Sequence, residues 1–243
     1  MEHITEVRIY KNPKKVYNAI AKSIVQLTQD SNQKIFNIAL SGGNSPKGLF
    51  EKMSKKYHDK IPWEKIHFWW GDERCVPPSD EQSNYKMAVD NLFSQIEIPK
   101  KNLHRIRGEE DPEGEARRYS ADLNENLNSR GNNPVFDLII LGLGDDGHTA
   151  SIFPDQLELL EYPENCAVAE HPLSGQKRIT VTGTVLNNAT RIFFLVIGES
   201  KAMRVSEIMN DSEAAKLLPA YYIAPTNGEL TWFLDEEAAS MIS

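Results

Sequence analysis

Residues 136–151 read FDLIILGLGDDGHTAS, and this stretch decides the class of fold. Its apolar half, residues 136–141, has the length of a strand that is buried in a parallel sheet. The run then ends in a glycine-rich loop that carries Asp145, Asp146 and His148. Ligands of open α/β sheets bind beyond the carboxyl ends of the strands, so these side chains are placed for binding or chemistry. We expect His148 to act as a general base, with Asp146 fixing its tautomer.

The same loop fits other interpretations. Gly142, Gly144 and Gly147 spell the G-x-G-x-x-G fingerprint of dinucleotide-binding loops. Two aspartates in the loop would repel a pyrophosphate, and the loop lies past the middle of the chain, so we do not favour a dinucleotide site. A metal site on His148 is disfavoured because the chain lacks a His-Glu-x-x-His motif. A purely structural role, a helix-capping cluster with a hydrogen-bonded histidine, stays open.

The rest of the chain alternates between strand-like apolar runs and amphipathic helical runs. This alternation predicts an α/β fold with a mostly parallel sheet covered by helices on both faces, and we expect residues 1–243 to form one domain. The expected strands are 3–10, 35–40, 66–70, 136–141, 166–169, 179–181, 192–197, 221–224 and 230–234. The expected helices are 14–29, 46–57, 84–96, 112–127, 200–209 and a short one at the C-terminus.

Composition narrows the class of protein. The 243 residues carry a formal net charge of −8, which disfavours a general nucleic-acid binder but leaves room for a small anionic ligand. The two cysteines, Cys75 and Cys166, form no Cys-x-x-Cys pair, so no structural zinc site is suggested. No apolar run approaches the roughly 20 residues of a membrane helix, and the N-terminus lacks a signal-peptide pattern. We therefore expect a cytoplasmic protein without membrane partners, either a monomer or a homodimer.

A second loop suggests a phosphate site. Residues Ser41, Gly42, Gly43, Asn44 and Ser45 link a strand to a helix that has proline at position 46. Glycines let the backbone approach a ligand, Ser45 can cap the helix, and the free N–H groups of a helix N-terminus bind anions. A plain capped turn would need no ligand. The sequence is neither a P-loop nor a serine-hydrolase elbow.

Four further charged residues are candidates for the same site. Asp72 and Arg74 follow the strand at 66–70, and Asp72 could position a sugar hydroxyl while Arg74 supports a developing oxyanion. Arg178 begins a strand and Lys201 opens a helix after the strand at 192–197, so both can lie near the phosphate loop. A surface ion pair is the simpler interpretation of Asp72 and Arg74, and scattered cations such as Arg178 and Lys201 are usually solvated.

Taken together, these stretches resemble the 6-phosphogluconolactonase family. The matching segments, which occur in the family's order, are SGGNSP at 41–46, DER at 72–74 with VP at 76–77 and SN at 83–84, GLGDDGHTASIFP at 142–154, RIT at 178–180, GESKA at 198–202 and LPA at 218–220. Each segment is weak alone, whereas the ordered set is specific.

The resemblance implies a Rossmann-like fold shared with glucosamine-6-phosphate deaminases. It implies hydrolysis of 6-phospho-D-glucono-1,5-lactone to 6-phospho-D-gluconate in the oxidative branch of the pentose phosphate pathway, without metal or organic cofactor. The family's phosphate-binding residues map onto the loop at 41–45, Arg178 and Lys201. Its proposed base maps onto His148, with Asp146 and Arg74 nearby. Ser45 stands where the family usually has threonine, which keeps the hydroxyl.

The sequence also bears on the two alternatives, which are a sugar-phosphate isomerase or deaminase and a non-catalytic sugar-phosphate-binding module. Deaminases of this fold typically continue after the histidine through Phe-Asn-Glu, whose glutamate supports that histidine. Here Phe153 occupies the place of the glutamate. The chain also retains both His148 and the phosphate loop and shows no basic helix-turn-helix segment, which argues against a binding module.

Overall fold

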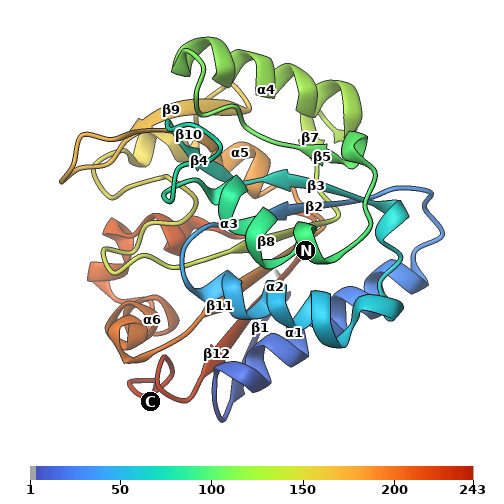
Figure 1. Cartoon of the computed structure of the whole chain (residues 1–243). Coiled ribbons are helices and arrows are strands. Elements are labelled where there is room, and N and C mark those ends of the chain that lie inside the picture. The colour runs from blue at the N-terminus through green and yellow to red at the C-terminus, as the bar shows by residue number, and fades with distance from the viewer. Residues whose placement is uncertain (1–3, 243) are drawn as a thin grey trace.

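The computed structural model describes residues 4–242. Its centre is a seven-stranded sheet with the order β1-β12-β11-β8-β2-β3-β5, in which every neighbouring pair is parallel (Figure 1). The strands are β1 (Ile4–Tyr10), β2 (Phe36–Leu40), β3 (Ile66–Trp70), β5 (Leu103–His104), β8 (Leu138–Leu141), β11 (Arg191–Val196) and β12 (Glu229–Asp235). The helices are α1 (Pro13–Asp30), α2 (Ser45–Lys56), α3 (Asn84–Asn91), α4 (Pro112–Asn126), α5 (Gly183–Leu186) and α6 (Ala202–Met209). The predicted α/β class with a parallel sheet is confirmed.

The order of the strands places a switch point in the middle of the sheet. From β2 the chain adds β3 and then β5 on one side, and from β8 it adds β11 and then β12 on the other. β2 and β8 are direct neighbours, with Ile38 opposite Leu138. Connections that leave adjacent strands in opposite directions open a crevice between the two following loops, and this is where open α/β sheets bind ligands. The loops concerned are the two glycine-rich stretches, 41–45 and 142–151.

Helices cover both faces of the sheet, as the end of β3 shows. Successive strand residues point to opposite faces. The Trp69 ring packs against Tyr119 of α4, whereas the Trp70 ring packs against Tyr85 of α3. The Tyr119 hydroxyl also accepts a hydrogen bond from the backbone N–H of Trp70 at 2.9 Å. α4 and α3 therefore lie on opposite sides, and all four rings belong to the buried or half-buried interior.

A smaller antiparallel sheet stands beside the carboxyl ends of the central strands. It has the order β4-β10-β9, made of β4 (Asp72–Arg74), β10 (Lys177–Val181) and β9 (Cys166–Glu170), and α4 packs over it (Figure 1). In its register Arg74 lies opposite Arg178, and Asp72 lies opposite Thr180. This sheet joins two predicted site segments that are more than a hundred residues apart. A third, two-stranded hairpin pairs β6 (Asn128–Arg130) with β7 (Asn133–Val135).

Several predicted elements differ from the structure. The strand predicted at 221–224 is wrong, because residues Pro219–Tyr222 form a 3-10 helix that the proline at its start favours. The predicted C-terminal helix is wrong, because residues 236–242 form turns. The helix predicted at 84–96 ends at Asn91 and is followed by a 3-10 turn at Phe93–Gln95. The prediction for residue 3 lies outside the described residues.

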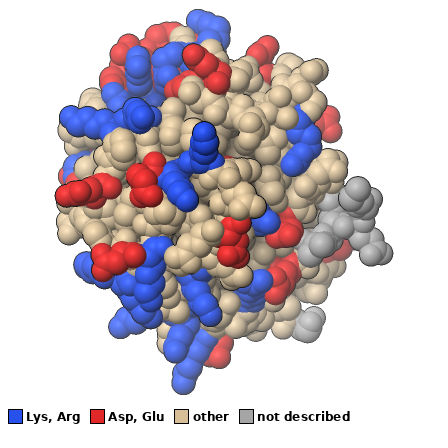
Figure 2. Space-filling model, turned by 90° about the vertical axis from the view of Figure 1, so that its right-hand side faces the viewer, with Lys and Arg blue, Asp and Glu red and all other residues tan. Residues whose placement is uncertain are grey.

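The surface carries charged side chains of both signs. Figure 2 shows one face of the molecule, where Lys and Arg side chains are interspersed with Asp and Glu over much of the area. Among residues 4–242 no helix is long and apolar enough to cross a membrane. Within the same range no group of three or more His, Cys, Asp or Glu side chains is arranged to hold a metal ion.

Candidate active site

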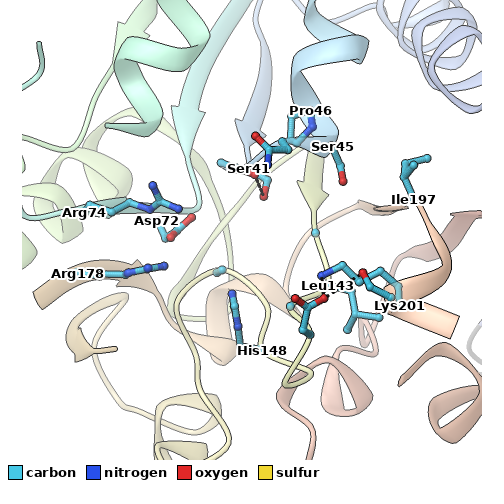
Figure 3. A pocket seen from close by; sticks show the side chains of 18 residues that line it. Ser41, Ser45, Pro46, Asp72, Arg74, Leu143, His148, Arg178, Ile197 and Lys201 are labelled. Carbon is cyan, nitrogen blue, oxygen red and sulfur yellow. Dashed lines mark hydrogen bonds and ion pairs between the residues drawn. The ribbon is translucent and has the colours of Figure 1, made fainter. Parts of the chain in front are cut away.

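A cavity of about 440 Å³ lies at the switch point, beyond the carboxyl ends of β2 and β8 (Figure 3). Of the eleven residues predicted from the sequence, ten line it: Ser41, Gly42, Gly43, Asn44, Ser45, Asp72, Arg74, His148, Arg178 and Lys201. The eleventh, Asp146, is hydrogen-bonded to His148. In Figure 3 the two arginines and Asp72 lie on one side of the cavity and Lys201 on the other, with the serine loop and His148 between them. Segments from five different strand ends thus meet in one place.

The serine loop delivers the N-terminus of α2 to the cavity. Gly43 has φ of +87°, a conformation that glycine adopts without strain. The helix begins at Ser45 and its N-cap is Asn44, so the prediction that Ser45 caps the helix is wrong. Within the described residues the Asn44 side chain makes no capping hydrogen bond. Pro46 has no N–H and the N–H of Lys47 donates to the carbonyl of Asn44, so Ser45 is the residue of the first turn whose N–H can serve an anion at the cavity.

Asn84 fixes this loop, and the sequence reasoning gave it no role. A Cβ atom on Gly42 would lie only 1.9 Å from Oδ1 of Asn84, so the loop can pack here only because residue 42 is glycine. Nδ2 of Asn84 donates to the backbone carbonyl of Asp72 at 2.9 Å and to its carboxylate at 3.3 Å. The side chain is 1% exposed. It ties the loop after β2 to the segment after β3. The one feature of the sequence that pointed to Asn84 was its place in the Ser83-Asn84 segment, which matches the family resemblance.

The Asp72 carboxylate is held from a second direction. The hydroxyl of Ser151 donates to Oδ2 of Asp72 at 2.6 Å, and Ser151 is fully buried. The backbone N–H of Ser151 donates in turn to Oγ1 of Thr180, the residue opposite Asp72 in the small sheet. Because Asp72 is itself 5% exposed and lines the cavity, its carboxylate has one fixed orientation.

Glu73 supports the same segment and also escaped the sequence reasoning. Its carboxylate accepts hydrogen bonds from the backbone N–H groups of Arg74, Asn84 and Tyr85 and from the hydroxyl of Ser83. Burial raises the pKa of Glu73, and the three backbone hydrogen bonds lower it again in part. A carboxylate at the first turn of α3 satisfies amides that the helix leaves open. Glu73 thereby fixes α3 relative to β4, and with it Asn84.

Arg74 and Arg178 form a pair of neighbouring cations. They face each other across β4 and β10, and Nη1 of Arg74 donates to the backbone carbonyl of Gln82 at 2.5 Å. The Nε atoms of both arginines are buried and have no hydrogen-bond partner among the described residues. Burial and then the nearby Arg74 charge lower the pKa of Arg178. Two cations this close favour an anionic ligand between or beside them.

His148 and Asp146 form the hydrogen-bonded pair that the sequence suggested. Nδ1 of His148 lies 2.5 Å from Oδ1 of Asp146, which also accepts the backbone N–H of His148 at 3.1 Å. Partial burial raises the pKa of the Asp146 carboxyl, but the hydrogen bond and charge of His148 outweigh it and lower the pKa to about 2. An ionised carboxylate can only accept, so Nδ1 carries the proton. Whenever the ring is neutral, Nε2 is the nitrogen that can accept a proton, and the ring points into the cavity (Figure 3).

The glycines of this loop have a structural explanation other than dinucleotide binding. A Cβ on Gly144 would lie 2.1 Å from Nδ1 of His148 and 2.6 Å from Oδ1 of Asp146. Gly147 has φ of +87°, and a Cβ there would meet the Leu218 side chain at 2.6 Å. The spacing that resembles G-x-G-x-x-G therefore makes room for the histidine–aspartate pair.

Phe153 completes the surroundings of His148. Its ring is fully buried and its centre lies 4.9 Å from that of His148. The Arg178 guanidinium lies over the same ring at 5.5 Å. The position that carries glutamate in the deaminase pattern thus holds an aromatic ring that packs against both residues. The carboxylate that supports His148 comes from Asp146 instead.

Neither cysteine is a candidate nucleophile. Burial raises the pKa of the Cys75 thiol to about 11 and that of the Cys166 thiol to about 12. Both thiols are protonated near neutral pH, and the reactive form of cysteine is the thiolate. The hydroxyl of Ser41, which lines the cavity, donates to the backbone carbonyl of Gly42.

Comparisons with known proteins agree with this geometry. The 6-phosphogluconolactonase of Haemophilus influenzae is 46% identical over 208 residues, which cover 85% of this chain and 87% of that protein. A crystal structure of the devB protein superposes with a TM-score of 0.94 at 40% identity and covers 99% of this chain and 100% of that one. A monomeric glucosamine-6-phosphate deaminase has the same fold, with a TM-score of 0.82 at 19% identity over 97% and 99% of the two chains.

The family model described as glucosamine-6-phosphate isomerases/6-phosphogluconolactonase matches residues 11–232, nearly the whole chain. The match includes both glycine-rich loops, the small sheet and the turn that carries Lys201. The chain belongs to the glucosamine-6-phosphate isomerase/6-phosphogluconolactonase family.

Proposed function

We propose that this protein hydrolyses 6-phospho-D-glucono-1,5-lactone to 6-phospho-D-gluconate, the lactonase step of the oxidative pentose phosphate pathway. The observation that carries the proposal is His148, held by Asp146 with Nε2 toward a cavity that also contains a helix N-terminus and three cations. The relatives at 46% and 45% identity are both named 6-phosphogluconolactonases, which supports the same reaction here.

The phosphate of the substrate would bind under the N-terminus of α2. Ser45 at the start of α2, Arg178 and Lys201 all line the cavity and come from three different elements, so we assign the phosphate to them. A dianion there gains from the helix dipole and from two cations at once. Such contacts are made equally in the ground state and the transition state, so they act mainly on KM.

The chemistry then needs one proton to be moved twice. Nε2 of neutral His148 takes a proton from water while the water oxygen bonds to C1 of the lactone. The carbonyl oxygen becomes an oxyanion, for which Arg74 is the neighbouring permanent cation. The bond from C1 to the ring oxygen then breaks, and the imidazolium returns its proton to that oxygen. Asp146 stabilises the imidazolium between the two proton transfers. Asp72 lines the same cavity and would accept a hydrogen bond from a sugar hydroxyl.

The alternative activity on this fold is that of an isomerase or deaminase. The deaminase that shares the fold is 19% identical, which supports the architecture and not the reaction. The ring of Phe153 where that pattern has glutamate favours the lactonase. A non-catalytic binding module would have no use for a histidine oriented by an ionised carboxylate, so the pair argues against it.

Three broader predictions accompany the proposal. We expect residues 1–243 to act as one domain, because the family match and a single buried cluster both span nearly the whole chain. We expect the protein to work in the cytoplasm without a nucleic-acid partner, which cell fractionation tests. Its state is a monomer or a homodimer, which light scattering on the purified protein decides.

The test is hydrolysis of freshly prepared phosphorylated lactone, beside the unphosphorylated lactone and with a chelator present. We expect rapid, chelator-resistant turnover of the phosphorylated lactone alone. His148→Ala should lose about 10²–10⁴-fold in kcat, the usual contribution of a general base. His58→Ala, a partly exposed histidine of another surface pocket, is the matched control. No acceleration above the spontaneous rate would overturn the proposal, and glucosamine 6-phosphate would be the next substrate to try.

A further inference from the structure

The loop after β8 carries two adjacent acids that do different things. Asp146 holds His148, whereas Asp145 turns to the other side and meets the turn after β11. Oδ1 of Asp145 lies 2.5 Å from Nζ of Lys201 and accepts the Ser200 hydroxyl at 3.3 Å. Lys201, one of the proposed phosphate ligands, is therefore already paired with a carboxylate of its own chain.

The pair is built so that the carboxylate can leave without moving the loop. The Asp145 side chain is 76% exposed, while that of Lys201 is 18% exposed. The backbone carbonyl of Asp145 separately accepts Nε of Arg204 at 3.1 Å. The hydrogen bond from Lys201 lowers the pKa of Asp145, so the carboxylate is charged near neutral pH. An exposed carboxylate is thus paired with a half-buried ammonium group at the edge of the cavity.

We infer that the Asp145 carboxylate is paired with the Lys201 ammonium group in the free enzyme and that the substrate phosphate displaces this carboxylate. This inference rests on the proposed function, since it assigns Lys201 to the phosphate. A phosphate dianion attracts an ammonium group more strongly than a carboxylate does, and the N-terminus of α2 and Arg178 add to that attraction. An unphosphorylated lactone offers nothing to replace the Asp145 contact. Asp145 therefore lowers the affinity for every ligand and makes binding depend on a doubly charged group.

A role in orienting Lys201 would have the opposite effect on phosphate affinity. If Asp145 merely oriented Lys201 toward the phosphate, removing its charge would weaken phosphate binding. If it competes, removing its charge strengthens binding, because the ligand no longer breaks an ion pair and no longer meets a neighbouring anion. Loss of the exposed Asp145–Lys201 ion pair and of the screened repulsion between Asp145 and the ligand together correspond to a change of about two- to tenfold in affinity for phosphate.

The experiment compares Asp145→Asn with Glu199→Gln, which removes one negative charge from the same turn as Lys201. Glu199 is exposed, and no ion pair of its side chain is recorded among residues 4–242. Dissociation constants for inorganic phosphate and for 6-phosphogluconate are measured by calorimetry at low ionic strength, beside kcat and KM for the lactone. We expect Asp145→Asn to bind both ligands about two- to tenfold more tightly, with kcat nearly unchanged and Glu199→Gln close to wild type.

A second comparison isolates the pair. In a Lys201→Met background there is no ion pair to break, so Asp145→Asn should give a smaller gain than it does in the presence of Lys201, because it then removes only the repulsion between Asp145 and the phosphate. Weaker phosphate binding by Asp145→Asn, an equal gain in Glu199→Gln, or a gain that is undiminished without Lys201 would each overturn the inference. Failure of the wild type to bind phosphate would overturn it too. A wild type that binds phosphate but leaves the lactone intact would overturn the proposed function alone, and the binding comparison would still decide the role of Asp145.

Discussion

Gly144→Ala tests the hydrogen-bonded pair of His148 and Asp146 without substituting either residue. The added Cβ would lie 2.1 Å from Nδ1 of His148 and 2.6 Å from Oδ1 of Asp146. Non-bonded carbon and nitrogen atoms settle near 3.5 Å, so one side chain must move by more than about 1 Å. A hydrogen bond of 2.5 Å between these atoms does not survive such a displacement. Either side chain can give way, because that of His148 is 26% exposed and that of Asp146 is 41% exposed.

The expected loss is about 10²-fold in kcat, since a displacement of about 1 Å of a reacting group costs on that order. The change should fall on kcat more than on KM, because the proposed phosphate ligands lie on other elements. Folding should survive, because the three atoms nearest to the added Cβ belong to two partly exposed side chains. Thermal denaturation followed by circular dichroism measures that point separately from activity.

Gly142→Ala is the matched control, two residues earlier in the same loop. Its Cβ would lie 3.6 Å from Oγ of Ser41, an ordinary contact, so we expect kcat to stay within a few-fold of wild type. Asp146→Asn, which keeps the shape and removes the charge, should lose activity as Gly144→Ala does. A Gly144→Ala enzyme that is folded and retains nearly full kcat would refute the view that the pair positions the base.

Three further predictions concern single side chains. Arg178→Ala should raise KM by about 10- to 100-fold with a smaller change in kcat, as measured by steady-state kinetics, because it removes a charged phosphate ligand. Lowering the pH should cost stability through Asp146: its pKa is about 2 when folded, so its contribution is complete above its unfolded value near 4 and is lost as the pH falls toward 2. Since its side chain is 41% exposed, that loss is only about 1 kcal/mol, and it should be absent in acid titrations of Asp146→Asn. Glu73→Ala should lower the free energy of unfolding by about 2–4 kcal/mol in urea, because several buried donors lose their acceptor.

The fold and the ends of the strands could be predicted because their signals are local. A short apolar run such as 138–141 followed by glycines identifies a buried strand and its loop whatever lies elsewhere in the chain. Polar residues at the carboxyl ends of parallel strands converge on one edge of the sheet, so the loops at 41–45 and 142–151 were expected to meet. The short strand Asp72–Arg74 was missed, because three charged residues give no apolar periodicity.

The residues that hold the site in place could not be predicted, because their partners are distant in sequence. Ser151 bonds to Asp72 across 79 residues, and Asn84 packs against Gly42 across 42 positions. A buried serine or asparagine looks like any other polar residue until the topology brings its partner close. Glu73 stood in the quoted Asp72-Glu73-Arg74 segment, yet only the structure shows that it serves the backbone of α3.

The chemistry of lactone opening fits a site with one oriented base. Isomerisation of a sugar phosphate moves a proton between two carbons and also opens a ring, which calls for more than one acid–base group. Lactone hydrolysis returns the proton taken from water to the ring oxygen, so a single imidazole can serve both steps. Here Asp146 binds Nδ1, Phe153 packs against the ring, and Nε2 is the nitrogen left to face the cavity. With a phenyl ring where a second carboxylate would stand, the environment of His148 favours one shuttled proton, and the phosphate ligands determine which lactone receives it.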